Sequence, residues 1–171
     1  MDAELRSLLI GTLGLDAALV AAMVLAVRRR PRSPADLASL HVPGWYAGTA
    51  ALQFAHFAEE YIGGFQILLP LALGLEPWSA KFFVNLNLAW LAAWLLSVPL
   101  VRRGFRPVFF LPWFLAIAGV VNGIVHPLLC LRAGGWFPGI WTAPAVGVAG
   151  AMLAHRLWKG TAAPEEVSRI T

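Results

Sequence analysis

The chain has 171 residues, of which 59% are hydrophobic and only 13% are charged. A soluble globular domain is closer to half apolar and a quarter charged, so this composition argues against an ordinary soluble domain and indicates a membrane protein. The net charge is +4, but the basic residues stand in short clusters between apolar runs. That pattern is typical of membrane-flanking loops, and we expect no nucleic-acid partner.

Five apolar runs follow one another along the chain. A helix rises about 1.5 Å per residue, so each run is long enough to cross the roughly 30 Å of a bilayer interior. The sequence therefore predicts an all-α, integral membrane helical bundle of about five transmembrane helices. A single transmembrane domain would occupy residues 1–160, and a polar cytoplasmic tail would occupy residues 161–171. The expected spans are 7–27, 45–73, 78–100, 107–129 and 139–157.

Two of these runs need comment. Acidic Asp2 and Glu4 precede the first run, so it reads as a retained span and not as a cleaved signal peptide. The second run contains Gly63, Gly64 and Pro70, which are points where a helix kinks or breaks. It is either one long tilted helix or a helix followed by a re-entrant piece.

The distribution of basic residues predicts the orientation. Ten of the thirteen Lys and Arg residues fall in the loops that five spans would place on one side, around residues 28–32, 102–106 and 156–169. The positive-inside rule puts that side in the cytoplasm, with the N-terminus outside and the C-terminus inside. We expect a multi-pass protein of a cell membrane, in contact with membrane lipid, and the sequence leaves homo-oligomer formation open.

Ionisable side chains inside hydrocarbon cost about 2.5–3.5 kcal/mol each, so each needs a reason. His56, Glu59 and Glu60 fall within five residues of the second run, and helical spacing puts them on one face. Asn122 and His126, also one turn apart, lie in the fourth run at a comparable depth. Polar side chains of two spans should therefore converge, with His56, Glu59, Glu60, Asn122 and His126 as candidate catalytic residues.

The third run adds Asn85 and Asn87, which point to nearly opposite sides of a helix. We expect one of them to face the bundle and to contact a substrate. His56, Glu59, Glu60 and His126 are together suitable ligands for one divalent metal ion, zinc, iron or manganese, with a position left open for water or substrate. Without a metal, the same carboxylates and imidazoles could transfer protons, or simply hydrogen-bond each other to fix the packing of the helices.

Three short elements carry a resemblance to a known family. His56-Phe57-Ala58-Glu59-Glu60 resembles the motif that gives the HXXEE family of multi-span membrane proteins its name. The Asn-x-x-x-His element of that family is similar to residues 122–126, and its Tyr-x-Pro-Gly-x-x-Thr element is similar to residues 136–142, with Trp136 in place of Tyr. The resemblance covers roughly residues 45–150.

The resemblance implies a membrane-embedded, metal-dependent enzyme but names no reaction. It also places Trp136, Thr142 and the Pro138-Gly139 turn near the mouth of the site, where we expect Trp136 and Thr142 to contact substrate. The sequence thus favours a hydrolase, oxidoreductase or isomerase of a hydrophobic or amphiphilic small molecule. Two other classes use similar residues: a proton-coupled carrier, and a module that binds a lipid, haem or another small molecule.

Overall fold

The computed structural model describes residues 3–163, so the expected polar tail lies outside the described residues except for its first three positions. The described chain is mostly helical, as expected. Its helices are α1 (Ala3–Gly11), α2 (Leu13–Arg28), α3 (Pro34–Ser39), α4 (Val42–Gly63), α5 (Phe65–Ala72), α6 (Ala80–Arg102), the 3-10 helix η1 (Arg106–Val108), α7 (Phe110–Ala133) and α8 (Ala143–Gly160).

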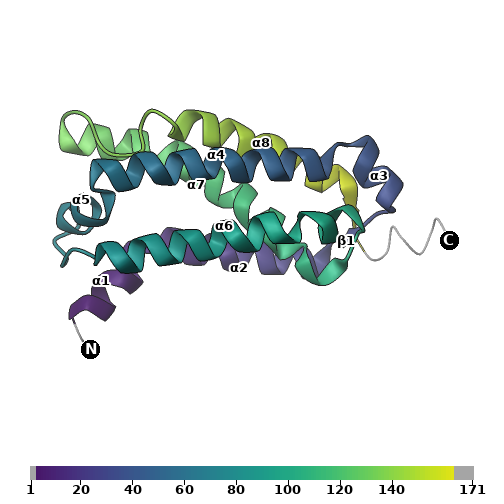
Figure 1. Ribbon diagram of the computed structural model, residues 1–171, viewed down its shortest axis with the longest axis horizontal. Helices are drawn as coiled ribbons and strands as arrows, with labels where there is room; N and C mark the ends of the chain where they lie inside the picture. Colours follow the sequence, from purple (N-terminus) through teal and green to yellow (C-terminus); the bar gives the residue numbers. More distant parts are fainter. Residues whose placement is uncertain (1–2, 164–171) are drawn as a thin grey trace.

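The helices α2, α4, α6, α7 and α8 run along the long axis of the molecule and alternate in direction (Figure 1). Each of them comes from one of the five apolar runs. The first run is divided at Thr12 into α1 and α2, and the second is divided at Gly64 into α4 and α5. Gly64 has a φ of 79°, a left-handed conformation that glycine adopts without steric cost, so α4 ends there. The helix α5 then lies at one end of the bundle (Figure 1).

Glycines bring α7 and α8 unusually close together. A Cβ atom on Gly123 would lie 2.7 Å from the Cα of Gly147, and one on Gly150 would lie 2.6 Å from the carbonyl oxygen of Ala116. Small residues allow helix backbones to approach in this way. The close packing fixes the start of α8 beside the end of α7, and so fixes the loop of residues 134–142 that joins them.

The opposite end of the bundle is held by a short ladder between β1 (Arg30–Pro31) and β2 (Thr161–Ala162), which pair antiparallel. The Arg29 guanidinium donates hydrogen bonds to the Thr161 side chain at 3.0 Å, the Thr161 carbonyl at 2.7 Å and the Trp158 carbonyl at 2.8 Å. It also lies 3.8 Å from the centre of the Trp158 ring. These contacts join the end of α2 to the end of α8.

Among the described residues, two segments are long and apolar enough to cross a membrane, Ala80–Arg102 and Arg106–Ala133. The helix α2 is shorter, with 16 residues, and α4 carries the polar residues of the second run. Five transmembrane crossings are therefore not confirmed, and two helices with membrane-spanning length and composition are what the structure supports.

Candidate metal centre

Three of the expected ligands meet inside the bundle. His56 and Glu60 lie one turn apart on α4, and His126 faces them from α7; all three are buried. Glu60 Oε1 is 3.5 Å from His56 Nε2 and 3.2 Å from His126 Nε2. The two imidazole rings meet edge to face, with centroids 4.7 Å apart. We call His56, Glu60 and His126 the His–Glu–His group.

The hydrogen bonds of His56 determine which of its nitrogen atoms is free. The Thr142 hydroxyl donates to Glu59 Oε2 at 2.6 Å, and its oxygen lies 2.8 Å from His56 Nδ1. Because the hydroxyl proton is already used, Thr142 accepts from His56, and Nδ1 carries the hydrogen. In a neutral imidazole the lone pair is then on Nε2, which points toward Glu60.

His126 is arranged in the same way by a different partner. Its Nδ1 lies 2.7 Å from the carbonyl oxygen of Pro138, which can only accept a hydrogen bond. Nδ1 therefore carries the hydrogen here too, and the Nε2 lone pair faces Glu60. Histidines that ligate metal ions usually donate their second N–H to a carbonyl or a carboxylate, which holds the ring in position.

Two of the three separations between the ligand atoms are close to those of a metal site. Ligands at about 2.0–2.1 Å from a tetrahedral zinc ion lie about 3.3 Å from each other. The two nitrogen-to-oxygen separations of the His–Glu–His group are 3.2 and 3.5 Å, and all three atoms lie within 4.8 Å of one another. This group could therefore hold a metal ion; the structure does not identify which.

The charges in the group also call for a cation. With both histidines neutral, two nitrogen lone pairs and a carboxylate oxygen face one another, and all three are acceptors. His56 Nε2 is buried and has no hydrogen-bond partner among the described residues. Buried acceptors without donors are costly, so a proton or a metal ion must lie between them.

Glu59, expected as a fourth ligand, lies outside the His–Glu–His group. Its carboxylate accepts hydrogen bonds from the backbone N–H groups of Trp141 at 3.0 Å and Thr142 at 2.9 Å, besides the Thr142 hydroxyl. The three-residue separation from His56 turns Glu59 toward α8, whereas the four-residue separation turns Glu60 toward α7. Glu59 therefore supports His56 through Thr142.

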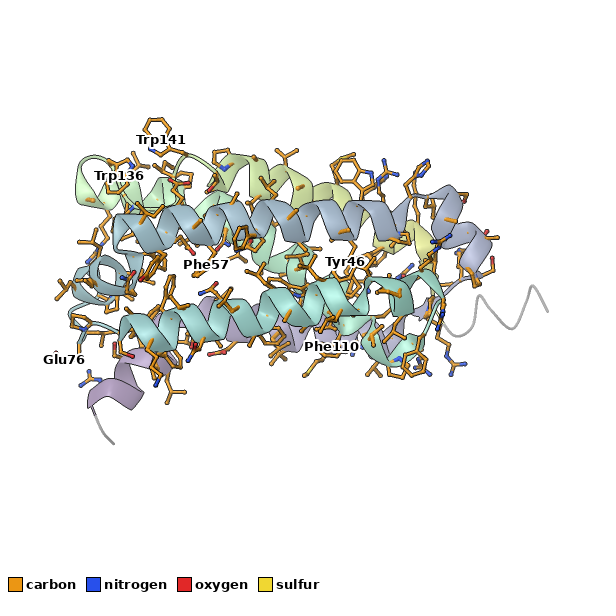
Figure 2. The ribbon with its side chains drawn as sticks, in the orientation of Figure 1. Tyr46, Phe57, Glu76, Phe110, Trp136 and Trp141 are labelled. Carbon is orange, nitrogen blue, oxygen red and sulfur yellow. The ribbon has the colours of Figure 1, made fainter. Side chains whose placement is uncertain are left out.

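Of the remaining expected site residues, some lie beside the His–Glu–His group and others are exposed away from it. Asn87 and Asn122 line a cavity next to the group, whereas Asn85 is exposed and points away from it. Asn122 lies one turn before His126, but the hydrogen bond that orients the His126 ring goes to the Pro138 carbonyl. Thr142 forms a hydrogen bond with His56. Trp136 is 52% exposed and belongs to the loop of residues 134–142. Figure 2 shows it near one end of the bundle.

The cavity has a volume of about 560 Å³ and lies among α1, α2, α4, α5, α6 and α7. Glu60 and His126 form part of its wall, together with apolar side chains such as Phe83, Leu86 and Trp90. An ion in the His–Glu–His group would therefore face a largely apolar space of the size that small ligands occupy.

The resemblance placed the Pro138-Gly139 turn near the mouth of the site, and in the structure both residues contact the imidazoles themselves. Gly139 has a φ of 89°, and a Cβ atom there would overlap the ring of His126 and lie 3.0 Å from His56 Cε1. No other residue would leave both imidazoles in place. The signal available in the sequence was the Pro-Gly pair in a short loop just after His126.

Comparisons with known proteins give no independent assignment, because no family model, curated protein or solved structure matches the chain.

Proposed function

We propose that the protein is a five-span membrane enzyme that binds one divalent metal ion through His56, Glu60 and His126 and acts on a hydrophobic or amphiphilic small molecule. The observation that carries this proposal is the convergence of two Nε2 lone pairs and a carboxylate oxygen at metal-ligand spacing on the wall of an apolar cavity. We also propose membership of the HXXEE family on the three sequence elements described above.

The surface supports placement in a membrane. Large apolar side chains are exposed on all five long helices, for example Val20, Ile62, Leu96, Leu131 and Val148. Exposed apolar surface of this extent is unfavourable in water and is expected where lipid surrounds the helices. In this setting α2, α4 and α8 cross the membrane together with α6 and α7.

Three protein ligands are typical of catalytic metal sites, which keep a position open, whereas structural zinc sites have four. Two histidines and one carboxylate suit zinc, iron or manganese. Such an ion would polarise a carbonyl or phosphoryl oxygen, or acidify a bound water. The chain itself orients both imidazoles through Thr142 and Pro138, and the apolar wall restricts water.

Haem is disfavoured by the same geometry. The two imidazoles are in edge-to-face contact with centroids 4.7 Å apart, and the Glu60 carboxylate lies beside both Nε2 atoms. A porphyrin ring between two axial histidines has no space in this arrangement.

The test is elemental analysis of protein purified without chelators and supplied with zinc, iron and manganese. We expect about one ion per chain in the wild type and loss of the ion in Glu60→Gln and His126→Ala. Glu76→Gln is the matched control, because Glu76 is exposed at the end of the bundle (Figure 2), and it should keep the ion. A wild type without any of these metals would overturn the proposal and favour the proton-coupled carrier.

A further inference from the structure

The cavity beside the His–Glu–His group is not apolar throughout. Three carboxamides, Gln53 from α4, Asn87 from α6 and Asn122 from α7, contribute to its wall. We call these three residues the amide belt. Amides in a membrane-embedded cavity are costly unless they have partners, so their presence in an apolar wall requires an explanation.

Contacts between the helices place the three amides at one level. Phe57 of α4 and Phe83 of α6 are in ring contact, with centroids 5.7 Å apart, and these helices run in opposite directions. Gln53, four residues before Phe57, is therefore level with Asn87, four residues after Phe83.

The level of Asn122 follows from the other helix pair. The helices α4 and α7 run in the same direction, and their His56 and His126 rings are in contact. Gln53 precedes His56 by three residues, and Asn122 precedes His126 by four, so these two amides also share a level. The belt is therefore about 5–10 Å along the helix axis from the His–Glu–His group.

Asp16 of α2 lines the same cavity. Gly14 of α2 faces Val121 of α7, since a Cβ on Gly14 would lie 3.9 Å from a Val121 methyl carbon. Asp16 follows Gly14 by two residues and so lies close to the level of the belt. Its Oδ2 accepts a hydrogen bond from Thr12 at 3.0 Å, which leaves the other carboxylate oxygen for a ligand.

The hydrogen bonds that the protein makes leave both amide oxygens and amide N–H groups free at this level, and Asp16, the one charged side chain there among the described residues, is negative. Gln53 is 7% exposed, and its side-chain oxygen has no hydrogen-bond partner among the described residues. Asn87 uses its NH₂ group to bond the Phe83 carbonyl at 2.9 Å, which leaves its oxygen. Asp16 adds carboxylate oxygens, and no Lys or Arg is among the described residues that line the cavity. The Asp16 carboxylate and the free amide oxygens therefore favour a ligand head that donates hydrogen bonds and is neutral or positively charged.

We infer that the amide belt and Asp16 bind the hydrogen-bond-donating head, a hydroxyl or amino group, of a long-chain amphiphile whose reacting bond lies at the His–Glu–His group. This inference rests on the proposed function, whose substrate class it specifies. The apolar wall accommodates the chain, and the Asp16 carboxylate, with no Lys or Arg among the described lining residues, disfavours carboxylate and phosphate heads.

The test measures equilibrium binding of three radiolabelled probes with the same C16 chain to the protein in phosphatidylcholine nanodiscs. The probes are hexadecanol, hexadecylamine and palmitate. We expect saturable binding of the alcohol or the amine at about one molecule per chain, and binding of palmitate at least about tenfold weaker. Asp16→Asn separates the two head groups, because loss of the negative charge should weaken binding of the positively charged amine by clearly more than it weakens binding of the alcohol. Palmitate binding as tight as that of the other probes would overturn the inference.

A second comparison tests the residues themselves. We expect Gln53→Leu and Asn87→Leu each to weaken binding of the preferred probe about fivefold or more, since each removes a hydrogen bond in a buried site. Asn85→Leu is the matched control on the same helix and should bind as the wild type does. Asn87 is only half-buried, so its variant serves even if Gln53→Leu fails to fold.

Metal content, measured on the same samples, separates the two proposals. Belt variants that keep the ion and lose the probe support the inference, whereas belt variants that bind the probe as the wild type does overturn it. A wild type that binds the alcohol or amine without holding any metal would contradict the proposed metal enzyme and still support the belt.

Discussion

Two polar clusters, one near each end of the bundle, differ in whether their side chains find hydrogen-bond partners. At the end formed by β1 and β2, the guanidinium of Arg29 meets three acceptors and an indole face. In the His–Glu–His group, acceptors face acceptors, and His56 Nε2 has no partner among the described residues. A polar cluster that satisfies itself stabilises a fold, whereas one that leaves a buried acceptor open indicates a ligand.

The largest expected effect comes from Gly139→Ala. The new Cβ would overlap His126, and the positive φ is strained for alanine, at a cost of about 1–3 kcal/mol. We expect metal binding to fall by more than the roughly 10–100-fold that loss of an outer-shell hydrogen bond causes. The matched control is Gly135→Ala in the same loop, where a Cβ meets open space. Equal metal content in the two variants would show that the loop does not position the histidines.

A smaller effect is expected from Thr142→Val, which keeps the shape of the side chain and removes the hydroxyl between Glu59 and His56. His56 would lose the partner that keeps its hydrogen on Nδ1, so metal affinity should fall about 10–100-fold. Competition titration with a metal-binding dye measures this change. Thr142→Ser retains the hydroxyl and should restore the affinity; if it fails to do so, the hydrogen-bond chain is not the cause.

Arg29→Gln tests the hydrogen-bonded cluster around Arg29, at the end of the bundle formed by β1 and β2. It removes several hydrogen bonds and the indole contact, so we expect a loss of stability of about 1–3 kcal/mol, seen as a lower unfolding temperature. Metal content should not change, because the affected contacts are at the far end of the bundle (Figure 1). The control is Arg28→Gln at the exposed neighbouring position. A metal loss in Arg29→Gln alone would mean that the two ends are coupled.

The smallest effect belongs to Trp136→Tyr, which introduces the residue usual in the HXXEE family. Trp136 is half exposed and packs beside Gly63, away from the His–Glu–His group. We expect a change in stability within about 0.5 kcal/mol and unchanged metal content. A clear change in metal affinity would instead give this aromatic position a direct part in the site.

The ligand residues could be identified from sequence because ionisable residues inside apolar runs are conspicuous, and helical spacing then assigns them to faces. His56 and Glu60, one turn apart, and His126 on a second helix were predicted to meet, and they do. The separate direction of Glu59 was not predicted, because it depends on where α8 begins relative to α4.

Some features of the fold depend on contacts between segments that are distant in the sequence, so no short sequence pattern predicts them. The pairing of Arg30 with Ala162 joins residues far apart in the sequence, and residues 161–163 were expected to be part of a polar tail. The exposure of Asn85 and the inward position of Asn87 follow from the rotation of α6, which the sequence restricted to two alternatives. The second run was expected to form either one long tilted helix or a helix followed by a re-entrant piece, and the left-handed Gly64, which ends α4, excludes the single long helix.

The loop of residues 134–142 has a thermodynamic consequence. Its Pro138 carbonyl accepts a hydrogen bond from His126, its Thr142 hydroxyl accepts one from His56, and two of its backbone N–H groups bind Glu59. Opening this loop releases both imidazoles, so ion affinity and loop closure are reciprocally linked. A bound ion would protect the loop from added protease, and a chelator would expose it; the same opening would give an ion a route into the site.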